Sequence, residues 1–74
     1  MIQEGTNVKW EWGDRYAIGE VKEMFAHEIS TTIHGHEVTI QGKVDDKALL
    51  IGHSDGTEIL RLQSQVTIYD IGRH

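Results

Sequence analysis

An alternating run of apolar residues near the start of the chain constrains its fold more than any other feature. Val8, Trp10 and Trp12 lie two positions apart, with charged residues between them. In an extended strand their side chains therefore share one face, while the charged residues point to the other. Gly13 follows at once and accepts the positive φ of a turn. The segment predicts a β-strand that buries one side and ends in a reversal.

A second extended segment, residues 16–25, follows the reversal. Alternation places Gly19, Val21 and Phe25 on one face of the predicted strand. The glycine in its middle predicts a bend or a close approach of another backbone. Val21, Met24 and Phe25 also fit a helical spacing, but the neighbouring segments are rich in β-formers, and we expect a strand.

β-branched residues dominate the next stretch, residues 27–40. Ile29, Thr31 and Ile33 would share one strand face. Gly35 divides the stretch into two short strands, joined either as a tight hairpin or as one strand broken by a bulge. The threonine-rich half of the stretch is the strand edge that we expect to be free for pairing.

Turn signals organise the C-terminal half. Asp55-Gly56 between two apolar runs is a strong hairpin signal. The other expected elements are a loop over residues 41–47, strands over residues 48–51 and 58–62, a 3₁₀ turn over residues 63–66, a last short strand over residues 67–69, and a frayed end over residues 70–74. Five or six short strands in so few residues predict a small SH3-like or OB-like barrel.

Length and composition bound the remaining possibilities. The chain has 74 residues, which predicts one domain over residues 1–74 with an ordered core over about residues 5–69. It has no cysteine, which excludes disulfides and thiolate metal ligands. With no apolar run of bilayer length and no signal peptide, we expect no membrane association and a cytoplasmic location.

The order and spacing of these signals resemble a known family of small proteins, the hypervirulence-associated proteins with a Tudor-like domain. The resemblance covers residues 5–66 and implies a five-stranded SH3-like barrel of the Tudor type without assigned catalytic residues. The residues that carry it are Gly5, Val8, Trp10, Trp12-Gly13, Gly19, Val21, Ser30 to Ile33, Gly35, Glu37 to Thr39, Ala48, Leu50-Ile51, Asp55-Gly56, Leu60-Arg61 and Ser64 to Val66.

The chain departs from the family pattern at several positions. Thr31 and His34 stand where family members tend to carry basic residues, and Leu49 stands where a tyrosine is common. The loop over residues 41–47 lacks the usual asparagine and proline pattern. These departures weaken an expectation of an anion-binding strand or of a complete aromatic cage.

Aromatic residues supply the candidate binding site. The resemblance to Tudor-type domains suggests a cage in which aromatic faces attract a methylated cation. Trp12, Tyr16 and Phe25 are the candidate walls, Tyr69 is an additional candidate, and Asp14 could supply a carboxylate. Small barrels also need large side chains in the core. Trp10 is therefore expected in the core, and Trp12, at the strand end, is open to either role.

Catalysis and metal binding have weaker support in the sequence. The serines lie in no nucleophile motif, and phosphate-binding glycine loops are absent. His34 and His36 flank Gly35, but a turn there would separate them, and no third ligand is apparent. We therefore expect no enzyme, no metal site and no cofactor.

Charge bears on the remaining classes of partner. The formal net charge is −5, which disfavours nonspecific binding to nucleic acid. A cationic patch would need folding to bring Lys9, Lys22 and Arg61 together. We therefore expect a non-catalytic module that binds a protein or peptide through its rim or a strand edge. A nucleic-acid-binding barrel is the alternative, and homodimerisation through residues 29–33 is a further hypothesis.

Overall fold

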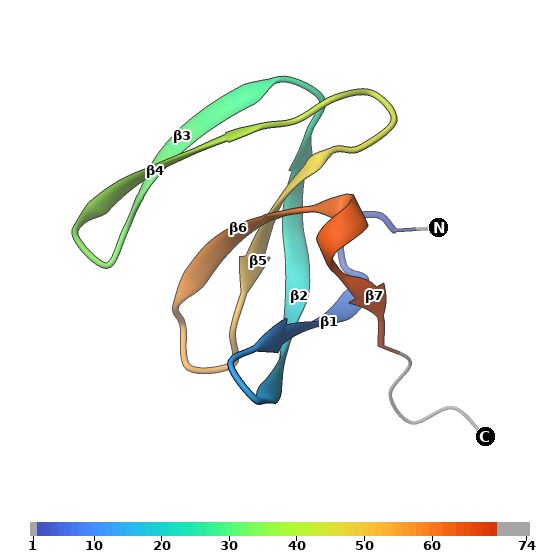
Figure 1. Cartoon of the computed structure of the whole chain (residues 1–74), viewed down its shortest axis with the longest axis vertical. Coiled ribbons are helices and arrows are strands. Elements are labelled where there is room, and N and C mark those ends of the chain that lie inside the picture. The colour runs from blue at the N-terminus through green and yellow to red at the C-terminus, as the bar shows by residue number, and fades with distance from the viewer. Residues whose placement is uncertain (1, 70–74) are drawn as a thin grey trace.

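The computed structural model describes residues 2–69, which form seven β-strands and one short 3₁₀ turn (Figure 1). The elements in chain order are β1 (Asn7–Trp12), β2 (Arg15–Phe25), β3 (Glu28–Ile33), β4 (His36–Gln41), β5 (Ala48–Gly52), β6 (Glu58–Leu62), the 3₁₀ turn η1 (Gln63–Gln65) and β7 (Thr67–Ile68). The prediction of an all-β chain with a 3₁₀ turn near its C-terminus is confirmed. The frayed end predicted for residues 70–74 lies outside the described residues.

Five strands form one antiparallel sheet in the order β6-β5-β2-β1-β7, and β3 and β4 form a separate hairpin. The predictions of five strands and of a closed barrel were wrong. The described residues contain seven strands, and the two sheets do not close into a barrel. The hairpin is inserted between β2 and β5 and pairs only with itself. The sheet stays open because β7 has only two residues, which pair with Val8 and Lys9 and leave the rest of β1 uncovered.

The core lies against the inner face of the five-stranded sheet. Val8 and Trp10 point into it from β1, and the exposed fraction of Trp10 is 4%. Leu49 and Ile51 join them from β5, with no exposed surface. Gly19 of β2 lies where a side chain would collide with Ile51, so the predicted close approach is confirmed. The buried apolar cluster comprises Ile2, Val8, Trp10, Val21, Leu49 and Ile51.

A β-bulge in β2 changes which residues face the core. Val21 pairs with Ile51, but the next pair joins Glu23 to Leu50, so Lys22 is an extra residue on β2. The expectation that Phe25 shares the core face with Val21 was therefore wrong. Because the bulge shifts the alternation by one, Met24 packs against the core instead.

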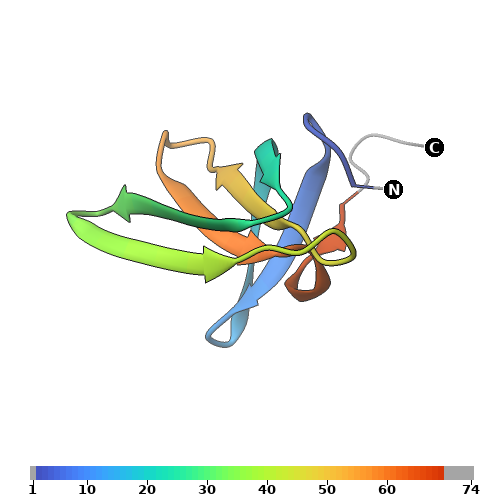
Figure 2. The ribbon, with the colours of Figure 1, turned by 90° about the horizontal axis from the view of Figure 1, so that it is seen from above.

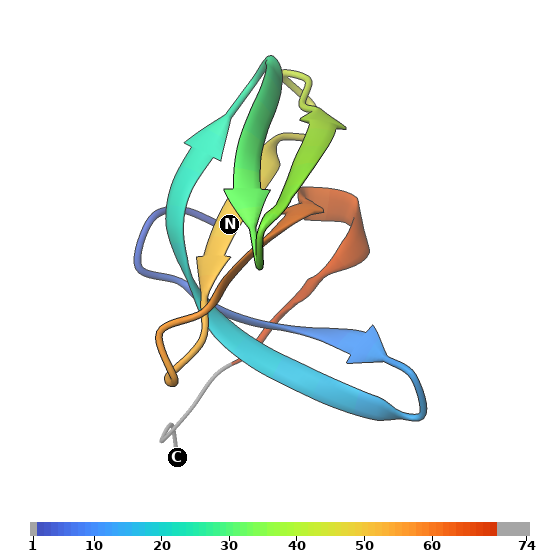
Figure 3. The ribbon, with the colours of Figure 1, turned by 90° about the vertical axis from the view of Figure 1, so that its left-hand side faces the viewer.

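A tight turn joins β3 to β4. His34 and Gly35 both have positive φ, 52° and 79°, as a two-residue type I′ turn requires. Of the two arrangements predicted around Gly35, the hairpin is therefore the one that forms. Figure 2 shows the hairpin extending away from the five-stranded sheet, and Figure 3 shows it in front of β5. The residues that alternate on its half-buried face are Ile29, Thr31, Ile33, Val38 and Ile40.

The turn between β5 and β6 is held by Asp55. Its carboxylate accepts hydrogen bonds from the Thr57 N–H at 3.0 Å and the Thr57 hydroxyl at 2.8 Å. These two bonds, the backbone one first, hold the pKa of Asp55 below its ordinary value of 3.8. The predicted Asp-Gly hairpin is thus formed, with local hydrogen bonds that favour the ionised carboxylate.

Residues 2–69 contain no helix of sufficient length and hydrophobicity to span a membrane.

Candidate functional site

A groove of about 590 Å³ lies where the five-stranded sheet fails to close. One wall is the uncovered part of β1 with Tyr16 of β2 beside it, and the other wall is β6 with the η1–β7 segment. The lining residues are Lys9, Trp10, Glu11, Tyr16, Arg61, Ser64, Gln65, Val66 and Thr67. The groove therefore follows from the shortness of β7.

The β1 wall presents unpaired backbone. The Tyr69 N–H donates to the Asn7 carbonyl at 2.8 Å, so Asn7 directs its backbone groups away from β2. Backbone groups alternate in direction along an antiparallel strand, and Lys9 and Glu11 therefore face the same way as Asn7. Lys9 is covered by its pairing with Thr67, whereas Glu11 lies beyond the end of β7. The N–H and carbonyl of Glu11 are thus available to another strand.

The β6 wall is capped by side chains. The Arg61 Nη1 donates to the Leu60 carbonyl at 2.9 Å, and the Leu62 N–H donates to the Gln65 Oε1 at 2.8 Å. These backbone groups lie on the outer edge of β6, because the adjacent odd-numbered residues bond to β5. Side-chain caps of this kind protect a free sheet edge against pairing. The groove thus has one edge that can accept a strand and one edge that cannot.

Two cations line the groove in a chain of net negative charge. The Lys9 Nζ lies 5.0 Å from the centre of the Tyr16 ring, within the range of a cation–π contact. Arg61 is held on the opposite wall by its bond to the backbone. Glu11 is the one carboxylate among the lining residues. The net charge of the side chains that line the groove is therefore positive, although the whole chain carries a formal charge of −5.

The four predicted site residues do not converge on one cage. Trp12 and Tyr16 are 64% and 65% exposed, so Trp12 is a rim residue rather than a core residue. Trp12 pairs with Arg15 and Tyr16 pairs with Glu11, so the two rings project from opposite faces of the sheet. Phe25 lies at the other end of β2, about 30 Å along the strand from Tyr16.

Asp14 and Tyr16 share a small hollow of about 190 Å³ at the β1–β2 turn. The face of the Tyr16 ring already carries the ammonium of Lys9. A methylated ligand would have to displace that ammonium and would find no second aromatic wall from Trp12 or Phe25. The geometry therefore gives no support to the aromatic cage.

The cations expected for a nucleic-acid patch are only partly brought together. Lys9 and Arg61 line the same groove. Lys22 lines a different hollow beside Gly52 and lies 3.5 Å from the carboxylate of Glu20.

Within residues 2–69, no group of three or more histidine, aspartate or glutamate side chains is arranged to hold a metal ion.

Sequence reasoning missed Gln65. It named Lys9 and Arg61, with Lys22, as cations that folding could bring together, but it did not predict the groove that Lys9 and Arg61 line. The sequence predicted a 3₁₀ turn over residues 63–66. It did not indicate that η1 would bring Gln65 back to the backbone of β6. This contact depends on the path of the chain after β6.

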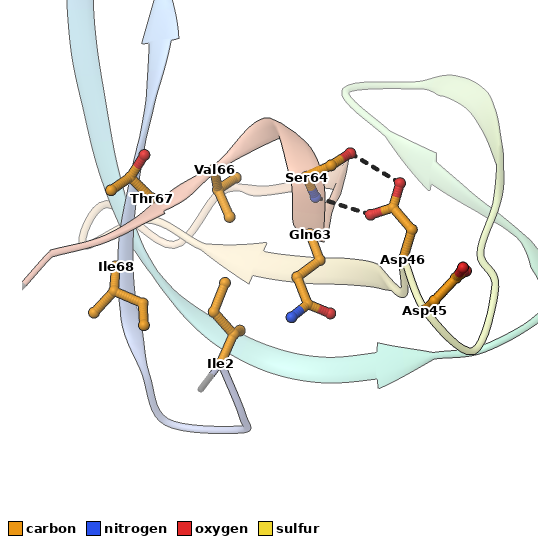
Figure 4. A pocket seen from close by; sticks show the side chains of 8 residues that line it. All are labelled: Ile2, Asp45, Asp46, Gln63, Ser64, Val66, Thr67 and Ile68. Atoms are coloured by element: carbon orange, nitrogen blue, oxygen red, sulfur yellow. Dashed lines mark hydrogen bonds between the residues drawn. The ribbon is translucent and has the colours of Figure 1, made fainter.

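A second hollow, of about 560 Å³, lies on the other side of η1 and β7 (Figure 4). Ile2, Val66 and Ile68 form its apolar part. At its rim the Asp46 carboxylate accepts hydrogen bonds from the N–H and the hydroxyl of Ser64, both at 2.8 Å. Asp46 thus fixes the segment that separates the two hollows.

Replacing Asp46 by alanine is expected to destabilise the chain by about 1–2 kcal/mol, because two hydrogen bonds to a carboxylate are lost. Urea denaturation followed by circular dichroism would measure the change. Asp45→Ala is the matched control, since Asp45 borders the same hollow and no hydrogen bond of its side chain is present in residues 2–69. Equal effects of the two substitutions would contradict the assigned role of Asp46.

The described residues thus form a small all-β domain with an open sheet edge and a groove along it. The family model for the TUDOR domain of hypervirulence associated proteins matches residues 5–66. The chain belongs to this family, and the resemblance found in the sequence is confirmed. A search of curated proteins and a search of solved structures each found no match to the chain.

Proposed function

We propose that this chain is a non-catalytic module that binds an extended segment of another protein in the groove beside β1. The family supports a binding role in general, since Tudor-like domains are typically non-catalytic binding modules. The observation that carries the proposal is the contrast between the two walls. Glu11 offers unpaired backbone groups on one side, while Arg61 and Gln65 cap the backbone on the other.

Such a wall suits the addition of a peptide strand. In this mode, main-chain hydrogen bonds supply affinity and alternate side chains supply specificity. A strand added beside Glu11 would continue the line of β7 along the edge of β1. Its length is limited, because β1 ends at Trp12, three residues beyond the last residue that β7 covers.

The charges of the groove select the side chains of the ligand. Lys9 and Arg61 favour a carboxylate on the side of the peptide that faces them, and Tyr16 offers an exposed ring to an apolar neighbour. The preferred segment is therefore extended and carries acidic residues at alternate positions. Single-stranded nucleic acid would offer phosphates to the same cations, but only two cations, Lys9 and Arg61, line the groove.

A titration followed by ¹H–¹⁵N correlation spectroscopy tests this proposal. The probe is a peptide of about eight residues that alternates valine and glutamate. We expect shifts at the Glu11 amide, the Trp10 indole and the Gln65 side chain, and weaker binding of a peptide that alternates valine and lysine. An oligonucleotide of similar length is the third arm, and salt-sensitive binding of that probe alone would overturn the proposal in favour of nucleic acid.

Lys9→Gln is the variant that tests the site. It is expected to weaken binding of the valine–glutamate peptide about threefold to tenfold, because one cation of the groove is lost. Lys43→Gln is the matched control, since Lys43 lies in the loop after β4 and outside the groove. Equal losses in the two variants would show that the peptide responds to net charge alone and not to the groove.

A further inference from the structure

The β3–β4 hairpin has a free edge without the usual protection. β3 pairs with β4 alone, and four residues of β3 are isoleucine or threonine. It contains no proline, lysine or bulge, which are common devices against edge pairing. The edge of β6, in contrast, is capped by Arg61 and Gln65. The edge of β6 is therefore protected, whereas the edge of the hairpin is not.

The two edges of the hairpin also differ from each other. β4 lies next to β6, so its outer edge faces the body of the domain. β3 occupies the outer side of the hairpin, away from β6. The free edge is therefore that of β3.

We propose that the edge of β3 pairs with the same edge of a second copy of this chain, so that two hairpins form one four-stranded antiparallel sheet. This interface is separate from the groove and does not depend on the proposed peptide binding. A two-fold axis relates the two copies, as in most homodimers. The self-complementary sequence of β3 is what selects a second copy as the partner.

The register of this pairing follows from the hydrogen bonds inside the hairpin. The two-residue turn makes Ile33 and His36 a hydrogen-bonded pair, and the Gly42 N–H donates to the His27 carbonyl at the base. The odd-numbered residues of β3 therefore bond to β4. Ser30 and Thr32 direct their backbone groups outward, and only these even-numbered residues can bond to another copy.

Any register centred on a residue of β3 satisfies this parity, and side-chain complementarity selects the one centred on Thr31. When Thr31 meets its own copy at the two-fold axis, Ile29 lies opposite Ile33 of the second copy and Ser30 opposite Thr32. Shifting the axis to Ser30 places Ile29 opposite Thr31 and Glu28 opposite Thr32, and loses both matches. The first register is therefore preferred.

The Thr32→Pro variant tests the proposed contact without disturbing the hairpin. In the wild-type chain the Thr32 N–H points out of the hairpin, so proline there removes a hydrogen bond to the second copy while preserving the bonds between β3 and β4. Glu37→Pro is the matched control, because Glu37 lies directly opposite Thr32 and its N–H points out from the other edge. Dispersed ¹H–¹⁵N spectra of both variants would show that each one folds.

Sedimentation equilibrium over a range of protein concentrations measures the association. The wild-type mass is expected to rise from 8.4 kDa towards twice that value. Thr32→Pro is expected to raise the dissociation constant by about tenfold or more, since one ladder bond is lost from each copy, and Glu37→Pro should leave it unchanged. A wild-type chain that stays monomeric up to about 1 mM, where even weak contacts are populated, would overturn the proposal, as would equal losses in both variants.

Amide hydrogen exchange locates the interface independently of any substitution. In the proposed dimer the Ser30 and Thr32 amides are bonded to the second copy, and their exchange should slow as the protein concentration rises. The Glu37 and Thr39 amides face the other edge and should show no such change. Concentration-dependent protection at Glu37 and Thr39 instead would place the contact on β4 and contradict the proposal.

Discussion

Replacing Trp10 by alanine is expected to destabilise the chain by about 3–5 kcal/mol, because a large buried side chain leaves a cavity that the surrounding core cannot fill. Trp10 is 4% exposed and also meets the His53 ring edge to face, with the ring centres 5.4 Å apart. A chain of this size has a total stability of only about 5 kcal/mol. The variant should therefore be largely unfolded, and thermal denaturation followed by circular dichroism would measure the loss.

Trp12→Ala is the matched control for that experiment. Trp12 is on the same strand and the same face, but 64% of it is exposed, and removing it should change the stability by only about 0.5 kcal/mol. The two tryptophans of the sequence pattern thus differ widely in their energetic roles. A Trp10→Ala variant as stable as Trp12→Ala would contradict the assignment of Trp10 to the core.

Gly42→Ala is the second substitution with a large expected effect. A Cβ at this position would overlap the Phe25 carbonyl oxygen and lie 2.9 Å from the Ala48 nitrogen. Both are backbone atoms, so the collision cannot be relieved by rotating a side chain. We expect a loss of about 3 kcal/mol, measured by urea denaturation. The methyl group would also strain the base of the β3–β4 hairpin, where the Gly42 N–H bonds to the His27 carbonyl.

Gly13→Ala controls for the general cost of replacing a glycine. Gly13 has a φ of 65°, but a Cβ there would meet no atom within 4 Å. Its replacement should cost only about 1 kcal/mol of backbone strain. If Gly42→Ala proved no more harmful than Gly13→Ala, the close approach at Gly42 could not be a determinant of the fold.

Local patterns in the sequence predicted most of the strands. Alternation around Val8, Trp10 and Trp12 predicted β1, and the glycine-containing turns after it and around Gly35 predicted the reversals, because strand period and turn chemistry are properties of neighbouring residues. The bulge at Lys22 was not predicted. Its trace in the sequence is the spacing of three between Val21 and Met24, which also fits a helix, although a strand was predicted there.

Closure of the sheet could not be predicted in the same way. It depends on how far β7 runs along β1, and nothing near Thr67 in the sequence indicates that pairing stops at Lys9. The groove, and with it the joint role of Lys9 and Arg61, is a consequence of that distant pairing. The sequence left Trp12 open between core and rim. Trp12 and Tyr16 are both exposed, but the alternation of the strands separates them onto opposite faces.

The open edge of β1 is the central element of the proposed function, and amide hydrogen exchange at Glu11 tests it most directly. In the free protein the Glu11 amide should exchange rapidly, whereas the Lys9 amide, in the segment covered by β7, should be protected. Adding the valine–glutamate peptide should slow exchange at Glu11 and leave Lys9 unchanged. Unaltered exchange at Glu11 with the peptide bound would show that no strand is added at this edge, and would contradict the account.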